Sequence, residues 1–288
     1  MKLGVVILTM GDRQADLTRL LDSVLAQAGG PMRIVVVGNG IPLVGLPQGV
    51  EAIELPDNRG VPGGRNAGLA ALRAHGDVDV VMYLDDDGLL PDPHTGDRVR
   101  ELFAETPDLG IVSFRVADET GATQRRHVPR LRASDPMRAG DVTTFLGGGN
   151  AVRMAVADQT GDWPRQFFYA HEETDVAWRA LDAGWRIQYR PELVLRHPRT
   201  SPARHAVYYR MIARNRVWLA RRHLPAPLVP LYLGIWAAIT IARRPPAEGI
   251  RAWAGGFIEG WRTPCGPRRP IRWRTVWRMT RLGRPPIV

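Results

Sequence analysis

Short apolar runs alternate with amphipathic stretches over the first 115 residues. The runs predict strands and the stretches predict helices, because their apolar residues recur with helical spacing, as in Leu17, Leu20, Leu21 and Val24. Strands are predicted at residues 3–9, 33–37, 52–55, 78–84 and 111–115, and helices at 16–27, 64–74 and around 102–103. This alternation is typical of an α/β fold with a mostly parallel sheet flanked by helices. Ligands are then expected at the carboxyl ends of the strands.

The remaining chain is less regular and becomes helical toward its end. After a polar loop (117–142) and a glycine turn (147–149), helices are predicted near 152–158, 173–183, 203–222 and 228–242. The last of these has 15 uncharged residues and would span about 22 Å, less than the roughly 30 Å hydrocarbon core of a bilayer. A membrane-spanning helix is therefore not favoured. We divide the chain into a domain of residues 1–202 and a helical extension of residues 203–288.

The charge of the chain is concentrated in that extension. The 288 residues have a formal net charge of +10, and from Arg221 onward there are 13 arginines but only two acids. The preceding part is nearly neutral, which excludes a uniformly basic nucleic-acid-binding chain. The single cysteine, Cys265, cannot form an internal disulfide, and the apolar run of residues 3–10 is too short for a signal peptide. These features indicate a cytoplasmic location.

Three consecutive carboxylates follow the predicted strand 78–84, namely Asp85, Asp86 and Asp87. Like charges this close repel one another, and a divalent cation relieves the repulsion. Hard oxygen ligands suit Mg²⁺ or Mn²⁺. The alternative is a solvated acidic turn, which is common at Asp-Gly sequences.

Two further segments have residue types that suit phosphate binding and proton transfer. The glycine-rich segment 56–68 leads into a helix whose free N–H groups and Arg65 could contact phosphate, although it could equally be a plain connector. Glu172, Glu173 and Asp175 open the helix predicted at 173–183, where a carboxylate can act as a general base or simply favour the helix dipole. His197 follows an apolar run and is either structural or a metal ligand.

Together these motifs resemble family 2 glycosyltransferases of the GT-A fold. They occur in the family's order over roughly residues 3–200: Val37-Gly38-Asn39-Gly40, then the glycine-rich segment, the aspartate triplet and the acidic helix start. The chain is most similar to rhamnosyl- and galactofuranosyltransferase-like members. The resemblance implies metal-dependent, inverting transfer of a hexosyl or deoxyhexosyl group from a nucleotide-diphosphate-sugar to an acceptor hydroxyl. The acceptor would be a cell-envelope polysaccharide, a lipid-linked glycan or a metabolite.

The resemblance also implies a role for individual residues. Contacts to the nucleotide-sugar would come from Thr9, Asn39, Asp57, Arg65, Asp85 and Asp86, and the metal, Mg²⁺ or Mn²⁺, would be held by Asp85, Asp87 and His197. Glu173 would be the base, with Glu172 and Asp175 as alternatives, and Gly148, Gly149 and Trp163 would line the sugar or acceptor pocket. Gly38 stands where the family usually has aspartate, so UDP, dTDP and GDP donors all remain open.

The extension combines tryptophan with arginine, as in Trp273, Trp277, Arg274 and Arg278. This combination suits an anionic membrane surface, such as the inner face of the plasma membrane. The alternative is packing against the catalytic domain or a second subunit as a homodimer. Two other functions are compatible with parts of the chain: a non-catalytic scaffold that binds sugar nucleotides, and nucleic-acid binding through the Arg/Trp tail. The acidic motifs and the neutral front domain argue against them, so we expect no nucleic-acid partner.

Overall fold

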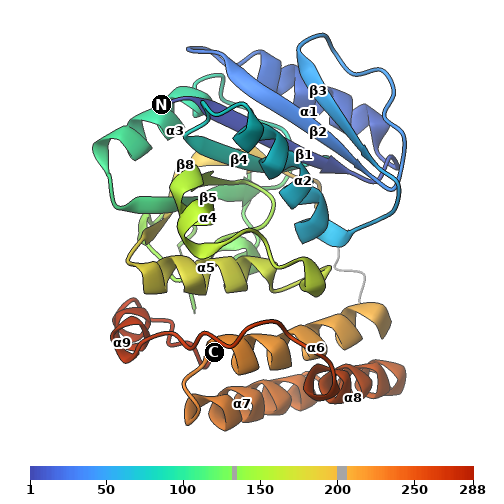
Figure 1. Ribbon diagram of the computed structural model, residues 1–288, viewed down its shortest axis with the longest axis vertical. Helices are drawn as coiled ribbons and strands as arrows, with labels where there is room; N and C mark the ends of the chain where they lie inside the picture. Colours follow the sequence, from blue (N-terminus) through green and yellow to red (C-terminus); the bar gives the residue numbers. More distant parts are fainter. Residues whose placement is uncertain (132–134, 200–205) are drawn as a thin grey trace.

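The protein folds around a central sheet flanked by helices (Figure 1). The computed structural model describes residues 1–131, 135–199 and 206–288. The strands in these ranges are β1 (Leu3–Thr9), β2 (Met32–Asn39), β3 (Val50–Leu55), β4 (Val80–Asp85), β5 (Leu109–Ala117), β6 (Gly140–Asp141), β7 (Asn150–Arg153) and β8 (Arg186–Arg196). Their order across the sheet is β3-β2-β1-β4-β7-β5-β8-β6. Strands β1 to β4 run parallel and β7 runs antiparallel to both of its neighbours, so the predicted α/β fold with a mostly parallel sheet is confirmed.

The helices fall into two groups. Those that cover the sheet are α1 (Gln14–Leu25), α2 (Gly60–Ala74), α3 (Thr95–Glu105), α4 (Met154–Thr160) and α5 (Glu172–Ala183). Those that form the extension are α6 (Ala206–His223), α7 (Leu228–Ala242), α8 (Ala247–Arg262) and α9 (Trp273–Arg281). Helix α7 coincides with the predicted apolar helix. Residues 203–205 of the predicted helix 203–222, and the proposed domain boundary at 202, lie outside the described residues.

Three predictions about these elements were wrong or incomplete. Helix α2 begins at Gly60, one turn before the predicted start at Gly64. The helix predicted at 152–158 begins only at Met154, because the preceding residues form β7 between β4 and β5. Strand β8 was not predicted: Ile187, Tyr189, Leu193 and Leu195 are buried, but Pro191 interrupts the apolar alternation and a proline argues against a strand in the sequence.

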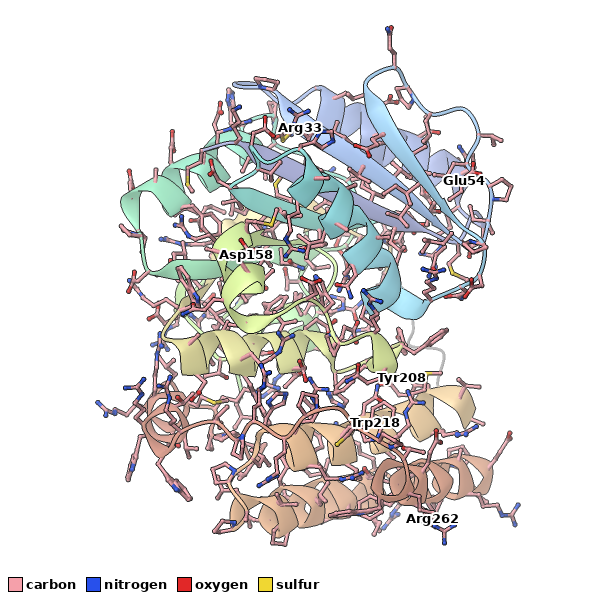
Figure 2. The ribbon with its side chains drawn as sticks, viewed as in Figure 1. Arg33, Glu54, Asp158, Tyr208, Trp218 and Arg262 are labelled. Atoms are coloured by element: carbon pink, nitrogen blue, oxygen red, sulfur yellow. The ribbon has the colours of Figure 1, made fainter. Side chains whose placement is uncertain are left out.

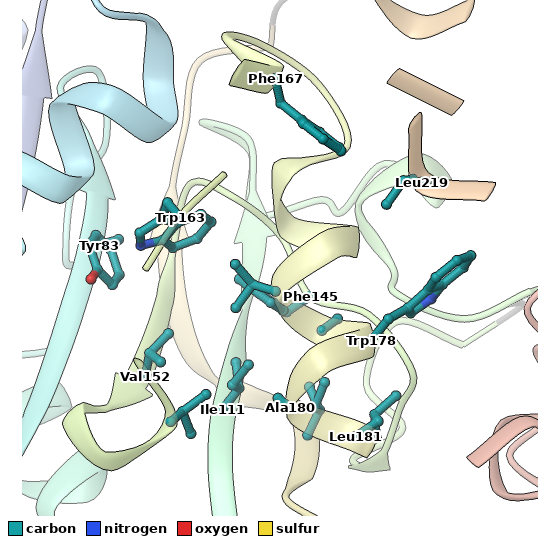
Figure 3. Packing of buried hydrophobic residues seen from close by; sticks show 14 of the residues in the cluster. Tyr83, Ile111, Phe145, Val152, Trp163, Phe167, Trp178, Ala180, Leu181 and Leu219 are labelled. Carbon is teal, nitrogen blue, oxygen red and sulfur yellow. The ribbon is translucent and has the colours of Figure 1, made fainter. Parts of the chain in front are cut away.

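Each face of the sheet has its own hydrophobic core. One core lies between the sheet and helices α1 and α3, and includes Leu20, Leu84 and Phe103. The other lies on the side of α2, α4 and α5, where Tyr83, Phe145, Trp163 and Trp178 pack together (Figure 3).

The extension belongs to this second core. Leu219 of α6, Tyr232 of α7 and Met279 of α9 are buried in the same cluster as Trp178 of α5. Helix α6 lies directly beneath α5, with α7 and α8 on its far side (Figure 1), and Trp218 of α6 is buried while Arg262 of α8 faces outward (Figure 2). The extension thus packs on the sheet domain as a layer, which the sequence pattern had offered only as an alternative.

Among the helices of the described residues, none combines the length and the apolar character needed to cross a membrane.

Candidate active site

A cavity of about 440 Å³ opens at the carboxyl ends of the strands. The chain passes from β1 to β2 and β3 on one side and then returns to β4 on the other side of β1, so the strand order reverses at β1. Ligand sites in open α/β sheets lie at such switch points. The cavity wall accordingly contains Met10 after β1, Asn39 at the end of β2 and the Asp85–Asp87 triplet at the end of β4.

The triplet is embedded in a network of charges. Asp87 is 6% exposed and pairs with Arg13, while His197 Nε2 lies 3.1 Å from Asp87 Oδ1. Asp85 is more accessible, and Arg65 lies 3.5 Å from its Oδ1. The structure therefore brings together Asp85, Asp87 and His197, which are far apart in the sequence, at one side of the cavity.

The pKa values in this network move in different directions. Burial raises the pKa of Asp86 to about 6, although a hydrogen bond with Thr9 opposes the shift. Burial would also raise the pKa of Asp87, but His197 and Arg13 outweigh it and lower that pKa. The hydrogen bond that His197 donates to Asp87 raises the pKa of His197 to about 9. In this arrangement Asp87 is a carboxylate and His197 an imidazolium at neutral pH.

Asn39 fixes the loop that precedes α2. Its amide nitrogen donates to Asn58 Oδ1 at 2.9 Å and to Gly60 O at 3.3 Å, and its Oδ1 accepts the Arg59 N–H at 2.8 Å. These contacts leave Asn39 and Asn58 in the cavity wall. The predicted Asp57 instead points outward, with 70% of its side chain exposed, and is absent from the wall.

One other residue predicted to contact the nucleotide-sugar, Thr9, lies behind the cavity wall. Thr9 is buried and accepts the Gly11 N–H at 3.1 Å, so it supports the turn after β1 and does not line the wall. Steric crowding explains the glycine at position 38, because a Cβ there would lie 3.0 Å from Leu43 Cγ and closer still to the Ile41 carbonyl oxygen. An aspartate does not fit at this position without moving the backbone.

Arg65 lies between Asp85 of the triplet and the Trp163 ring, behind the cavity wall. Arg65 is 4% exposed, donates to Gly147 O at 2.8 Å and has its Cζ 4.6 Å from the centroid of the Trp163 ring. Asn66 fixes the backbone of Trp163 with two hydrogen bonds of 2.9 Å: its Nδ2 donates to Trp163 O, and its Oδ1 accepts the Trp163 N–H. Trp163 was predicted in the sugar or acceptor pocket, but it is buried under Arg65 and does not reach the cavity.

The glycine turn 147–149 separates the triplet from the acidic start of α5. A Cβ on Gly147 would overlap the Glu173 carboxylate, and one on Gly148 would overlap that of Asp85. Gly149 instead packs against Leu195 and Phe114. The predicted Gly148 and Gly149 thus do not line the cavity, but the absence of side chains lets Glu173 and Asp85 approach two adjacent residues of one turn, Gly147 and Gly148.

Glu172 and Glu173 differ in environment although they are adjacent. Glu172 is 2% exposed, and burial together with the charge of Glu173 raises the pKa of Glu172 to about 8. Burial also raises the pKa of Glu173, but the positive charge of Arg65 opposes the shift. At neutral pH Glu172 is therefore largely protonated, and Glu173 is the more available carboxylate.

A strained loop leads into α5. Phe168, Ala170 and His171 have φ values of 62°, 68° and 69°, a region that non-glycine residues rarely adopt. Asn215 of α6 holds this loop, since its Nδ2 lies 3.0, 2.8 and 2.7 Å from the carbonyl oxygens of residues 167, 169 and 170. The sequence showed no sign of this role, which depends on the docking of α6.

Asp175 is separated from the two glutamates by its partners. It is fully buried, and its carboxylate lies 2.7 Å from Arg179 Nε, 2.9 Å from Arg222 Nε and 2.6 Å from His223 Nε2. Burial alone would raise its pKa, but His223, Arg179 and Arg222 hold the pKa of Asp175 far below its usual range. Such a carboxylate is a poor proton acceptor, so it joins α5 to α6 and does not suit the role of base.

Sequence reasoning missed several residues of the wall. Asp12 and Arg13 follow β1, and their position after a predicted strand was a usable signal. Val207 and Met211 come from α6, and no local signal connects that helix with the cavity.

The three candidate metal ligands are of a chemical type that binds divalent cations, because Asp85 and Asp87 offer hard oxygens and His197 offers an imidazole. Their arrangement is that of ion pairs, however, and among the described residues no three His, Cys, Asp or Glu side chains are grouped as metal ligands. Binding of a cation would have to displace Arg13 from Asp87 and the proton from His197.

A mostly parallel sheet with an acidic cavity at its switch point and two carboxylates at a nearby helix start is the GT-A architecture of glycosyltransferases. The model of glycosyl transferase family 2 matches residues 5–161, more than half of the chain, and the protein belongs to this family. A comparison with curated protein sequences gives no match.

Solved structures share the fold at low sequence identity. S. aureus TarS 1–349 in complex with UDP-GlcNAc has a TM-score of 0.62 at 14% identity, over 96% of this chain and 83% of that one. GalNAc-T7 with UDP, GalNAc and Mn²⁺ has a TM-score of 0.63 at 11% identity, over 91% of this chain and 56% of that one. A longer TarS chain is covered only to 39%. These similarities establish the GT-A fold.

The Asp175 cluster gives a prediction about stability. Replacing Asp175 by Asn leaves Arg222 and Arg179 without their buried partner, so we expect the free energy of unfolding to fall by about 3–5 kcal/mol at pH 7. Because the pKa of Asp175 is depressed in the folded state, its contribution is present above the unfolded value of about 3.9 and is lost as the pH falls further. Urea unfolding at several pH values should therefore show a smaller acid-induced loss for Asp175→Asn than for the wild type.

The matched control is Asp16→Asn, which removes an ion pair with the exposed Arg19 and should cost less than about 1 kcal/mol. Equal effects of the two substitutions would contradict the importance assigned to Asp175.

Proposed function

We propose that this glycosyltransferase transfers a hexosyl or deoxyhexosyl group from a nucleotide-diphosphate-sugar to an acceptor hydroxyl, with metal dependence and inversion of configuration. The supporting observation is the glycine turn 147–149, which packs against both Asp85 and Glu173. A group that binds a diphosphate and a group that can take a proton thereby lie on either side of one short backbone segment. The nucleobase, UDP, dTDP or GDP, stays open.

In this proposal the donor occupies the cavity at the carboxyl ends of β1, β2 and β4. Asn39 and Asn58 offer polar contacts in the wall, and Arg65 beneath the triplet adds positive charge near the diphosphate. Asp85, Asp87 and His197 would hold Mg²⁺ or Mn²⁺. The cation would neutralise negative charge on the departing nucleoside diphosphate. Asp86 lies in the cavity wall and would contact the donor, whereas Thr9, Asp57 and Trp163 lie outside the wall.

Glu173 is the proposed general base. Glu173 is only partly buried as a residue and its carboxylate lies against Gly147, whereas Glu172 is buried and Asp175 is paired with arginines. Glu173 accepts the proton of the acceptor hydroxyl as the oxygen attacks the anomeric carbon from the face opposite the leaving group. Bond formation on that face and departure of the diphosphate on the other produce inversion in a single displacement.

Glu173→Gln tests the base. We expect turnover to fall by about 100-fold or more with the donor affinity retained, because the amide cannot accept the proton. Glu172→Gln is the matched control: since Glu172 is largely protonated at pH 7, its amide should cost less than about tenfold. Turnover measured with a donor identified by a nucleotide-sugar screen decides the question, and near-normal rates for Glu173→Gln would exclude this residue as the base.

Asp87→Ala tests the metal site. If Asp87 is a ligand, calorimetry with the identified donor should show affinity that rises with Mn²⁺ in the wild type and no longer responds to Mn²⁺ in the variant. Asp57→Ala removes an exposed carboxylate outside the cavity wall and should behave as the wild type. An unchanged Mn²⁺ response in Asp87→Ala would refute the assignment.

We further propose that the extension rests on the anionic inner face of the plasma membrane, close to a lipid-linked or membrane-proximal acceptor. Trp273 and Trp277 are 53% and 62% exposed, and their spacing of four residues places them on one side of α9. Arg274 and Arg281 belong to the same helix. Exposed indole rings beside arginines suit the headgroup region of anionic lipid.

Vesicle flotation tests this surface. The wild type should float with phosphatidylglycerol-containing vesicles and less with pure phosphatidylcholine, and Trp273→Ser with Trp277→Ser should reduce flotation at least fivefold. Val44→Ser, which removes an equally exposed apolar residue between β2 and β3, is the control and should float normally. A tryptophan-dependent homodimer in sedimentation, without flotation, would favour the subunit interface instead.

A further inference from the structure

A second, smaller cavity of about 90 Å³ lies between the sheet domain and the extension. Its walls come from the start of α5 (His171, Thr174), from α6 (Arg216), from α7 (Trp236) and from the segment after α9 (Arg284). It shares no lining residue with the larger cavity among the described residues. The volume is that of about three water molecules, which is too small for a nucleotide but sufficient for a phosphate group.

The charged side chains that line this cavity at neutral pH are two arginines, Arg216 and Arg284. Within the described residues, no Asp or Glu side chain lines it, and neither Arg216 nor Arg284 forms an ion pair with a carboxylate. Burial lowers the pKa of Arg216 to about 10 and also lowers that of Arg284. Burial and the two arginines together hold the pKa of His171 well below its usual value. The cavity thus brings two largely desolvated arginines close to one histidine.

Two buried N–H donors in the described walls of this cavity have no acceptor. In the described part of the chain, the N–H groups of Arg216 Nε and Trp236 Nε1 are buried without a hydrogen-bond partner, and the ring nitrogen His171 Nε2 also lacks one. The Arg216 guanidinium stacks on the Trp236 ring, with Cζ 3.5 Å from the centroid, so one of its faces is covered while Nε at its edge has no partner. A buried N–H group without a partner costs free energy, so two such groups on residues that line one small cavity favour the binding of an acceptor there.

We propose that this cavity binds a phosphate group. A phosphate carries about −1.5 to −2 charges at pH 7 and three acceptor oxygens, so one group can neutralise Arg216 and Arg284 and also accept the unpaired N–H groups. A carboxylate would leave one arginine uncompensated. The site goes beyond the transfer reaction proposed above and does not depend on it. The phosphate is either the free ion or part of a phosphate ester that reaches the cavity.

Titration with inorganic phosphate tests this site. We expect the wild type to bind phosphate and to gain thermal stability relative to chloride at equal ionic strength. Arg216→Met and Arg284→Met should each weaken the affinity at least tenfold in calorimetry. Circular dichroism verifies folding, and Arg216→Lys, which keeps the charge but loses the planar fork, should give an intermediate affinity.

Two matched variants locate the bound ion. Arg274→Met removes an exposed arginine of α9, and Arg13→Met removes one from the larger cavity, so both should retain phosphate binding. The proposal is overturned if the wild type does not bind, if Arg216→Met and Arg284→Met bind normally, or if only Arg13→Met loses binding. Titration with glycerol 3-phosphate then distinguishes the sources: binding that depends on Arg216 assigns a phosphate ester, and binding of inorganic phosphate alone assigns the free ion.

Discussion

One buried carboxylate determines how the two parts of the chain fit together. Asp175 has no access to water, so its charge must be balanced by protein groups. Two of the three side chains that contact its carboxylate, Arg222 and His223, come from the last turn of α6. This requirement fixes the docking of α6 against α5. Once docked, α6 also brings Asn215 to the strained loop before α5. The position of Glu173 therefore depends on a helix that lies outside the matched family region.

The two domains that the sequence suggested are therefore packed together in the structure, with a shared core and a shared cavity wall. Leu219, Tyr232 and Met279 share a core with Trp178, and Met211 lines the larger cavity beside the aspartate triplet. An extension that could be removed without affecting the site would contribute neither core residues nor cavity wall. Here it contributes both, so the sheet domain and the extension form one packed structure around α5.

The sequence was sufficient for features set by local pattern. The apolar runs predicted β1 to β5, and the placement of Asp85–Asp87 after a strand predicted their presence at the sheet edge. Features set by distant contacts escaped prediction. Trp163 reads as a pocket residue in the sequence, but Asn66 and Arg65 bury it. In the sequence Asp175 cannot be distinguished from Glu172 and Glu173, because its partners on α6 are distant in the chain. The place of Arg13 in the site likewise depends on its ion pair with Asp87, 74 residues away.

The basic charge of the tail serves several distinct interactions. Arg222 balances Asp175, and Arg272 pairs with Asp182 at the end of α5, so part of the charge attaches the extension to the acidic helix. Arg284 lines the small cavity without a carboxylate partner among the described residues, and Arg274 is exposed on α9. His171 and Thr174, which line the small cavity, flank Glu172 and Glu173 at the start of α5. Because Coulomb interactions are weakly screened in a buried region, any charge that enters this cavity acts on the same helix start that bears the two glutamates.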